Sequence, residues 1–205
     1  MARQTLSIEE KQRKQQTIID SALELFATRG YDTTTMGDIA KSAGMSIGTL
    51  YLYFESKIVI FALLYKRALD LLEKSFGDAL EFPSPDVKTK ICMLLYTYIN
   101  FYKNNHNYYR VLSSGFMSKN NNIQLNETLT QKGLSILKKL ERPIAEGIEQ
   151  GVIKPCDTFK TVVSLWVMFD GILMLPDKTH VDSLSENFQE YYSYSIDIIL
   201  NGLLA

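Results

Sequence analysis

Apolar residues recur every three or four positions along almost the whole chain, a pattern typical of amphipathic helices. The first helix is predicted from a capping box at Ser7 and Glu10 to about Thr28. No segment has the apolar and polar alternation of a strand. We therefore expect an all-α protein. The inward stripe of the first helix is formed by Ile18, Ala22, Leu25 and Phe26.

The remaining helices are separated by recognisable breaks. A long helix is predicted from a cap at Ser56 to about Leu80, where two nearby prolines enforce a break. Ser84 should cap the next helix and Pro85 should begin it, and that helix should stop at 104–105. Four more helices are expected at 108–117, at 123–150 with a kink at Pro143, at 158–175 with Asp157 as cap, and at about 183–203 with Ser183 and Glu186 as capping box.

Residues 33–57 predict two short helices joined by a glycine turn, which is a helix-turn-helix. Thr35 and Asp38 form a capping box for the first of them, and Gly44 suits the turn because it reaches positive φ without steric cost. In the second, Leu50 and Phe54 are four residues apart and should face the core. The outward surface is then left to Ile47, Gly48, Thr49, Tyr51 and Tyr53, with Ser46 as the cap.

The run Gly-Thr-Leu-Tyr-x-Tyr-Phe-x-Ser-Lys at residues 48–57 resembles the signature of the TetR family of transcriptional regulators. The resemblance extends upstream through Tyr31, Gly30, Phe26 and Ala22 to the start of the first helix, and it covers about the first quarter of the chain. It implies a helix-turn-helix DNA-binding domain at 1–57, joined by a long helix to a helical ligand-binding and dimerisation domain at 58–205. It also implies double-stranded operator DNA as a partner.

The family's pattern, carried over position by position, implies which residues contact DNA. Lys57 would lie in the first turn of a helix, where a cation is unfavourable unless an anion such as phosphate is near. The alternative for Lys57 is a lysine that only contacts solvent. The alternative for Tyr51 and Tyr53 is that they only cover the core of the domain. The predicted DNA-binding residues are Thr35, Ile47, Gly48, Thr49 and Tyr51 at the groove, Tyr53 and Lys57 at phosphates, and the cap residue Ser46.

Charge adds little to this interpretation. Residues 1–57 contain seven basic and seven acidic side chains, so the predicted DNA-binding domain is neutral overall. The recognition surface lacks Arg, Asn and Gln, which make most bidentate contacts to bases. An apolar Ile47 can touch a thymine methyl group. We expect few direct base contacts, with DNA shape and spacing supplying the rest of the specificity.

The second half of the chain is rich in aromatic residues and methionine. Such stripes are most often packing, but several tyrosines and a tryptophan facing one interior would suit an apolar cavity with a few orienting hydroxyls. The family resemblance implies a cavity of this kind, for an apolar or amphipathic effector. Its predicted lining is Tyr98, Tyr102, Phe116, Trp166 and Phe169.

The last two helices carry more apolar residues than one partner helix can cover. Two such helices from each of two chains would form a four-helix bundle. The resemblance also implies a homodimer of this kind. The alternative is that these residues form the core of a monomer. Asp170 lies among these apolar residues and must pair or bind, with Lys138, Lys139 and Arg142 as structural candidates. The surplus residues include Leu165, Val167, Ile172, Ile196, Ile199 and Leu203.

Other chemistry finds little support. The 205 residues contain two distant cysteines, no apolar leader and no run long enough to span a bilayer, so we expect a soluble cytoplasmic protein. His106 and His180 lie in polar contexts without metal-ligand spacing or a neighbouring nucleophile. We expect no enzyme activity, metal or cofactor. The hypothesis is a ligand-responsive repressor, and the alternative is a helical enzyme or carrier for small molecules that does not bind DNA.

Overall fold

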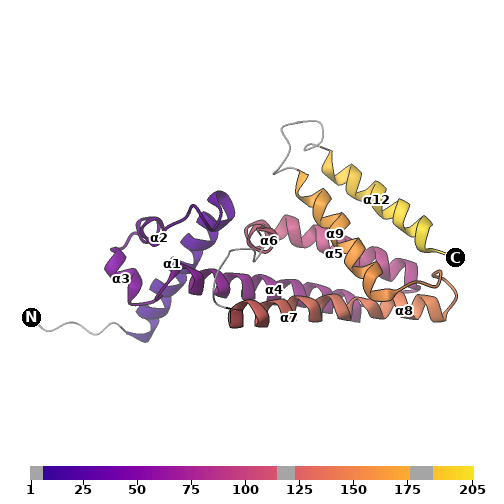
Figure 1. Cartoon of the computed structure of the whole chain (residues 1–205), viewed down its shortest axis with the longest axis horizontal. Helices are drawn as coiled ribbons and strands as arrows, with labels where there is room; N and C mark the ends of the chain where they lie inside the picture. Colours follow the sequence, from indigo (N-terminus) through magenta and orange to yellow (C-terminus); the bar gives the residue numbers. More distant parts are fainter. Residues whose placement is uncertain (1–6, 115–122, 176–186) are drawn as a thin grey trace, which may run out of the picture. The chain divides into compact units, whose positions relative to one another are not determined.

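The structure is a computed structural model that describes residues 7–114, 123–175 and 187–205. Within these ranges the regular structure is helical, apart from one isolated β-bridge between Ile153 and Leu204 (Figure 1). The prediction of an all-α fold is confirmed. The helices are α1 (Ile8–Arg29), α2 (Met36–Ser42), α3 (Ile47–Tyr51), α4 (Lys57–Glu81), α5 (Val87–Asn104), α6 (His106–Ser113), α7 (Ile123–Lys139), α8 (Glu141–Glu149), α9 (Thr158–Leu173) and α12 (Phe188–Leu203).

Several helices begin at the predicted caps. Before α1, the Ser7 hydroxyl accepts from the Glu10 amide at 3.1 Å, and the Glu10 carboxylate accepts from the Ser7 amide at 2.9 Å. Before α9, the Asp157 carboxylate accepts from the Lys160 amide at 2.9 Å. These bonds satisfy amides that have no partner inside the helix.

The predicted start of α5 is wrong by two residues. The helix begins at Val87, and its cap is Asp86, whose carboxylate accepts from the Thr89 amide at 2.8 Å and from the Thr89 hydroxyl at 2.9 Å. The Ser84 hydroxyl instead donates to the Asp86 carbonyl at 2.9 Å. Asp86 outcompetes Ser84 because a carboxylate can accept from both donors of Thr89 at once.

The expected kink at Pro143 is a complete break one turn earlier. Helix α7 ends at Lys139 and α8 begins at Glu141, so only Leu140 separates them. Proline cannot donate to the carbonyl four residues before it, which is that of Lys139, and its ring crowds the same group. The Leu140 amide bonds to the Leu137 carbonyl at 3.0 Å, three residues back, which tightens the last turn of α7.

Two other boundaries also differ from the prediction. Helix α6 runs from His106 to Ser113, two residues earlier at its start than expected. Helix α12 begins at Phe188, while the expected cap residues Ser183 and Glu186 lie outside the described residues. No helix among the described residues is long and apolar enough to cross a membrane.

The chain divides into two compact units. The first contains Met1–Asp70 and Asn105–Leu129, and the second contains Leu71–Asn104 and Thr130–Ala205. Helix α4 begins in the first unit and ends in the second. The division at residue 57 into DNA-binding and ligand-binding domains concerns function and stays a prediction.

The first unit has one apolar core beneath its short helices. Phe26 from α1, Leu50 from α3 and Phe61 from α4 are each at most 2% exposed. Helix α6 packs against α1 and adds Val111, which is fully buried, and Arg110 donates to the carbonyl of Ala27 at 2.9 Å. The first half of α4 and α6 therefore complete the core on which the helix-turn-helix rests.

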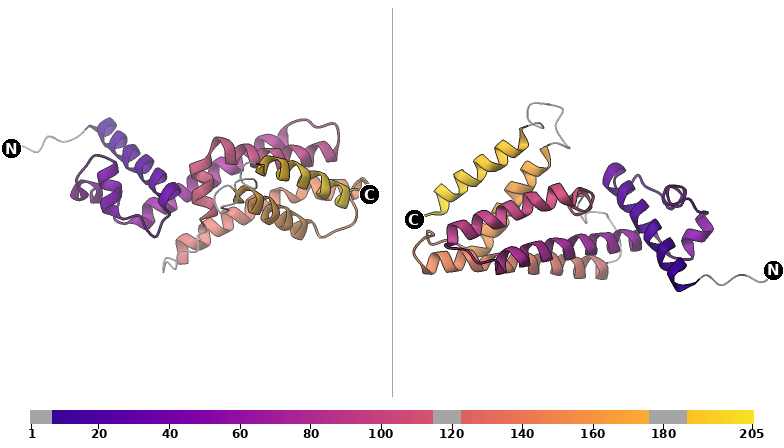
Figure 2. Two further views of the ribbon diagram at one scale, coloured as in Figure 1. Left: turned by 90° about the horizontal axis from the view of Figure 1, so that it is seen from above. Right: turned by 180° about the vertical axis from the view of Figure 1, so that it is seen from behind.

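In the second unit, α5 packs against α8 and α12, and α9 packs against α8 and α12 (Figure 2). Gly147 of α8 lets α5 approach closely, because a Cβ there would come within 2.8 Å of a Val87 side-chain carbon. Across the unit, the Tyr192 hydroxyl donates to the Leu95 carbonyl at 2.6 Å. Burial raises the pKa of Tyr192 well above its usual value.

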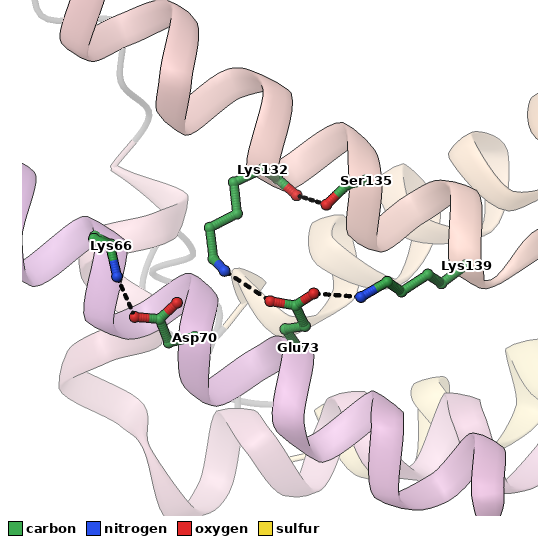
Figure 3. Close-up of polar contacts among 6 residues, drawn as sticks. All are labelled: Lys66, Asp70, Glu73, Lys132, Ser135 and Lys139. Carbon is green, nitrogen blue, oxygen red and sulfur yellow. Dashed lines mark hydrogen bonds and ion pairs between the residues drawn. The ribbon is translucent and has the colours of Figure 1, made fainter.

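A three-residue ion network joins α4 to α7 in the second unit (Figure 3). The Glu73 carboxylate of α4 points between two lysines of α7, accepting from Lys132 at 2.7 Å and from Lys139. Hydrogen bonds from Lys132 and then Lys139 hold the pKa of Glu73 below its usual value. Earlier in α4, Lys66 and Asp70 form a separate pair at 2.9 Å within the helix.

Glu73→Gln should make the protein less stable at neutral pH but not in acid. A carboxyl whose folded pKa is lowered stabilises the fold above its unfolded pKa of about 4.3, and this contribution is lost as pH falls through the folded value. We expect a loss of about 1 kcal/mol at pH 7 that shrinks steadily below pH about 4.3. Urea unfolding across this pH range measures the loss of stability.

Asp70→Asn, which breaks an exposed ion pair, is the control and should cost less than about 0.5 kcal/mol of stability. An equal loss of stability for both variants would contradict the ion network.

Candidate DNA-binding surface

The entry to the helix-turn-helix is fixed by the predicted capping box. The Asp38 amide donates to the Thr35 hydroxyl oxygen at 3.1 Å, while the Asp38 carboxylate accepts from the Thr35 hydroxyl at 2.6 Å and from its amide at 2.9 Å. These hydrogen bonds hold the pKa of Asp38 below its usual value. Gly44 then makes the turn with φ of 65°, as predicted.

The second helix, α3, is anchored by its inward residues. Leu50 is fully buried and Phe54 is 5% exposed, so the prediction that both face the core is confirmed. Ser46 caps the helix, accepting from the Thr49 amide at 3.1 Å, and the two hydroxyl oxygens of Ser46 and Thr49 lie 2.8 Å apart in a hydrogen bond. The anchoring leaves the opposite side of α3 to solvent.

Most of the predicted groove residues lie on that solvent side. Ile47 is 49% and Tyr51 is 51% exposed. Leu52 is 77% exposed and is absent from the predicted set, although its place four residues after Gly48 and beside Tyr51 could have indicated it. Thr35, Ser46 and Gly48 are also exposed, whereas Thr49 and Tyr53 are half-buried, with Tyr53 packed on the core.

Lys57 has partners that its sequence position did not indicate. Its ammonium donates to the carbonyls of Tyr31 at 2.7 Å, Thr34 at 2.8 Å and Asp32 at 3.4 Å, and it lies 4.2 Å from the centre of the Tyr31 ring. Burial lowers the pKa of Lys57. An ammonium has three donors, and these carbonyls can accept all of them. The geometry favours a clamp on the segment between α1 and α2, and the phosphate contact stays an untested prediction.

Comparison with known proteins bears on this element directly. The family model for bacterial regulatory proteins of the tetR family matches residues 18–64, which contain α2, α3 and the turn between them. The fatty acid metabolism regulator protein of Bacillus subtilis is 27% identical over 175 residues, covering 80% of this chain and 88% of the relative. The chain belongs to the TetR family. It is a transcriptional regulator of that family.

Two further comparisons cover most of this chain and most of each relative. The uncharacterised regulator YhgD of Bacillus subtilis is 25% identical over 167 residues, covering 82% of this chain and 86% of its own. The structure of the ketosteroid regulator KstR2 of Mycobacterium tuberculosis superposes with a TM-score of 0.73 at 19% identity, covering 94% and 95% of the two chains. The superposition with KstR2 shows that the two proteins have the same fold. TetR regulators bind DNA and act as dimers.

Four of the five aromatic residues predicted to line an effector cavity are among the described residues, and they differ in exposure. Tyr98, Tyr102 and Phe169 are buried in the second unit, at 8%, 7% and 1% exposure. Trp166 was expected in the interior, but it lies on α9 and is 44% exposed. Phe116 lies outside the described residues. The buried aromatic residues have packing partners, such as Tyr192 against Phe169 at 4.5 Å between ring centres.

Asp170 has a hydrogen-bond partner that the sequence did not indicate. Its carboxylate accepts from the Tyr98 hydroxyl at 2.8 Å. Lys139 is instead bonded to Glu73, and Arg142 forms a pair with Glu146. A search for opposite charge cannot find this partner, because a tyrosine hydroxyl donates a hydrogen bond without carrying a charge.

Helices α9 and α12 each expose apolar side chains. Val167 and Met168 of α9 are 58% and 39% exposed, and Tyr194 and Ile198 of α12 are 64% and 54% exposed. We call these four residues the α9/α12 face. An open groove of about 420 Å³ lies between the same helices, lined by Leu165, Met168, Ile199 and Leu203 with Asp157, Lys160, Thr161, Ser164 and Gly202.

The expectation that Ile196 and Ile199 are surplus surface residues is wrong. They are 3% and 9% exposed and belong to the core of the second unit. Ile198, one residue away, faces solvent instead. Because successive residues in a helix differ by about 100° in direction, adjacent isoleucines can have opposite environments.

Proposed function

We propose that this TetR-family chain is a ligand-responsive repressor. A homodimer binds a pseudo-palindromic operator through α3 and releases it when an apolar or amphipathic small molecule binds the second unit. The observation that carries the proposal is the anchoring of α3, in which Leu50 is fully buried while Ile47 and Tyr51 are about half exposed. Such a helix has a rigid inner side and a free outer side, as insertion into a major groove requires.

The proposed dimer forms through the α9/α12 face. Its four residues are apolar or aromatic, lie on two helices that pack together, and are between 39% and 64% exposed in one chain. Covering such exposed apolar side chains with a second chain would remove them from water, which favours association. Two helices from each chain would make a four-helix bundle with twofold symmetry.

Release of DNA follows from the spacing of the recognition helices. Two α3 helices held by one dimer can enter successive major grooves only if they lie about 34 to 36 Å apart, one turn of DNA. A ligand that binds better to a dimer with another spacing opposes DNA binding. A tenfold loss of operator affinity requires only about 1.4 kcal/mol of preference for that state.

Support for a ligand in the second unit comes from its buried aromatic residues. Tyr98, Tyr102 and Phe169 are buried there, and Tyr98 bonds to Asp170, which supplies a polar group among aromatic rings. Trp166 of the same unit completes the residues that we propose for ligand contact. One relative is named a fatty acid metabolism regulator, which makes fatty acids the first class of effector to test.

Selection from a random DNA pool tests the proposal. The full chain should enrich a pseudo-palindromic sequence, bind it with a strong salt dependence, and release it when a saturated fatty acid or another apolar probe is added. Binding that is salt-independent or shows no sequence preference would contradict DNA recognition and favour a carrier or enzyme. Transcription of a reporter behind the selected operator should fall when the protein is present; a rise would make it an activator.

A further inference from the structure

Four neighbouring residues are exposed to solvent, namely Ile47, Gly48 and Tyr51 of α3 and Leu52, which directly follows α3 in helical conformation. Ile47 and Tyr51 are four residues apart and make one row along the helix, and Gly48 and Leu52 make the neighbouring row. Ile47, Tyr51 and Leu52 are 49%, 51% and 77% exposed. Gly48 thus leaves bare backbone bordered by three large side chains. We call this surface the α3 notch.

The fold does not require glycine in the α3 notch. In the described residues positive φ occurs at Gly30, Gly44 and Gly151, and Gly48 is not among them. A Cβ at Gly48 would meet nothing nearer than the Ser46 hydroxyl oxygen at 4.0 Å. Glycine also weakens a helix relative to alanine, because it has more conformational freedom to lose. Its remaining physical advantage is that another molecule can approach the backbone closely.

Apart from the Tyr51 hydroxyl, the side chains that border Gly48 in the α3 notch are apolar. Residues 46–53 contain no charged or amide side chain. The hydroxyls of Ser46 and Thr49 are bonded to each other, and Ser46 also accepts from the Thr49 amide, so both are already used within the helix. Ile47 and Leu52 have no hydrogen-bonding groups in their side chains. In a major groove the base feature that suits such a surface is the 5-methyl group of thymine.

We propose that the α3 notch receives a thymine methyl group, so that each operator half-site is specified at an A·T pair by apolar contact. Ile47 and Leu52 would border the methyl group, and Gly48 would provide the room that lets it reach the backbone. This inference rests on the proposed function and deepens it, because it names the base chemistry that α3 reads.

Uracil substitution tests the inference on the selected operator. Uracil pairs as thymine does but lacks the methyl group, so each thymine of a half-site can be replaced in turn. At the contacted position we expect affinity to fall about fourfold per half-site, the effect of one apolar carbon group removed from burial. With Ile47→Ala the same uracil substitution should change affinity much less, because the partner of the methyl group is gone.

Gly48→Ala provides an independent test. The variant should fold with equal or higher thermal stability, yet bind the operator at least about tenfold more weakly, because the added methyl group occupies the space of the thymine methyl. Gly133→Ala is the matched control. A Cβ at Gly133 would meet nothing within 4 Å, and Gly133 lies in α7, so operator affinity should not change.

The results separate this inference from the proposed function. Sequence-selective binding that tolerates uracil at every thymine, or that is unchanged by Gly48→Ala, overturns the α3 notch as a methyl site while the repressor stands. A selected half-site without A·T pairs overturns it as well. Loss of all selective binding in the unmodified chain removes the proposed function, and the inference with it.

Discussion

Ile198→Glu should dissociate the proposed dimer into monomers and abolish operator binding. Ile198 is 54% exposed in one chain and would be covered in the four-helix bundle. Burial of an unpaired carboxylate from each chain costs several kcal/mol per ion, which exceeds what most interfaces can absorb. Because each half-site alone binds weakly, loss of the dimer also removes operator affinity. Sedimentation velocity measures the first effect and a gel-shift titration the second.

The control is Ile8→Glu, which adds the same charge at an isoleucine of α1 that is 76% exposed. This variant should remain a dimer. A dimer that persists with Ile198→Glu would place the interface elsewhere. Ile199→Glu is a poor substitute, since Ile199 is 9% exposed and a charge there would disturb the core of the second unit whether or not the dimer forms.

Lys57→Met should destabilise the protein by about 2 kcal/mol without changing the salt dependence of DNA binding. The substitution leaves the carbonyls of Tyr31 and Thr34, now bonded to the ammonium at 2.7 and 2.8 Å, without that donor. Charged hydrogen bonds of this kind contribute about 1.5 to 3 kcal/mol each, and partial exposure reduces the sum because water replaces the donor. Operator affinity should fall because the segment leading into α2 is less well fixed.

Two measurements distinguish this clamp from a phosphate contact. Urea unfolding gives the stability, and operator affinity at several salt concentrations gives the slope, which should decrease by about one for each phosphate that the protein no longer neutralises. Lys41→Met, at an exposed lysine of α2, is the control for stability. Unchanged stability together with a smaller slope for Lys57→Met would restore the phosphate contact predicted from the sequence.

The features predicted correctly from the sequence depend on neighbours within a few residues. The capping boxes at Ser7 and Thr35, and the cap at Asp157, each join groups three residues apart, so the relevant atoms can be identified from the sequence alone. The anchoring of α3 by Leu50 and Phe54 follows from helical spacing in the same way. The fold class and the solvent-exposed side of α3 could therefore be predicted.

The features that could not be predicted depend on partners far away in the sequence, or on which side of an apolar helix is buried. Lys57 bonds to carbonyls 23 to 26 residues earlier, and Asp170 bonds to Tyr98, 72 residues away. The helix that contains Trp166 has apolar residues on nearly every side, so its pattern has no period that could separate core from surface. The same limit applies in α12, where the sequence pattern does not distinguish the buried Ile199 from the exposed Ile198.

The composition of the first unit has a consequence for how the protein is made. Its core includes Val111, and its α1 is bonded through the Ala27 carbonyl to Arg110, although the helix-turn-helix is complete in the sequence more than forty residues before. During synthesis the first helices must wait for α6 to leave the ribosome before their apolar surface is covered. A nascent chain halted after α4 should therefore be captured by chaperones and cut by proteases, and one halted beyond α6 should resist both.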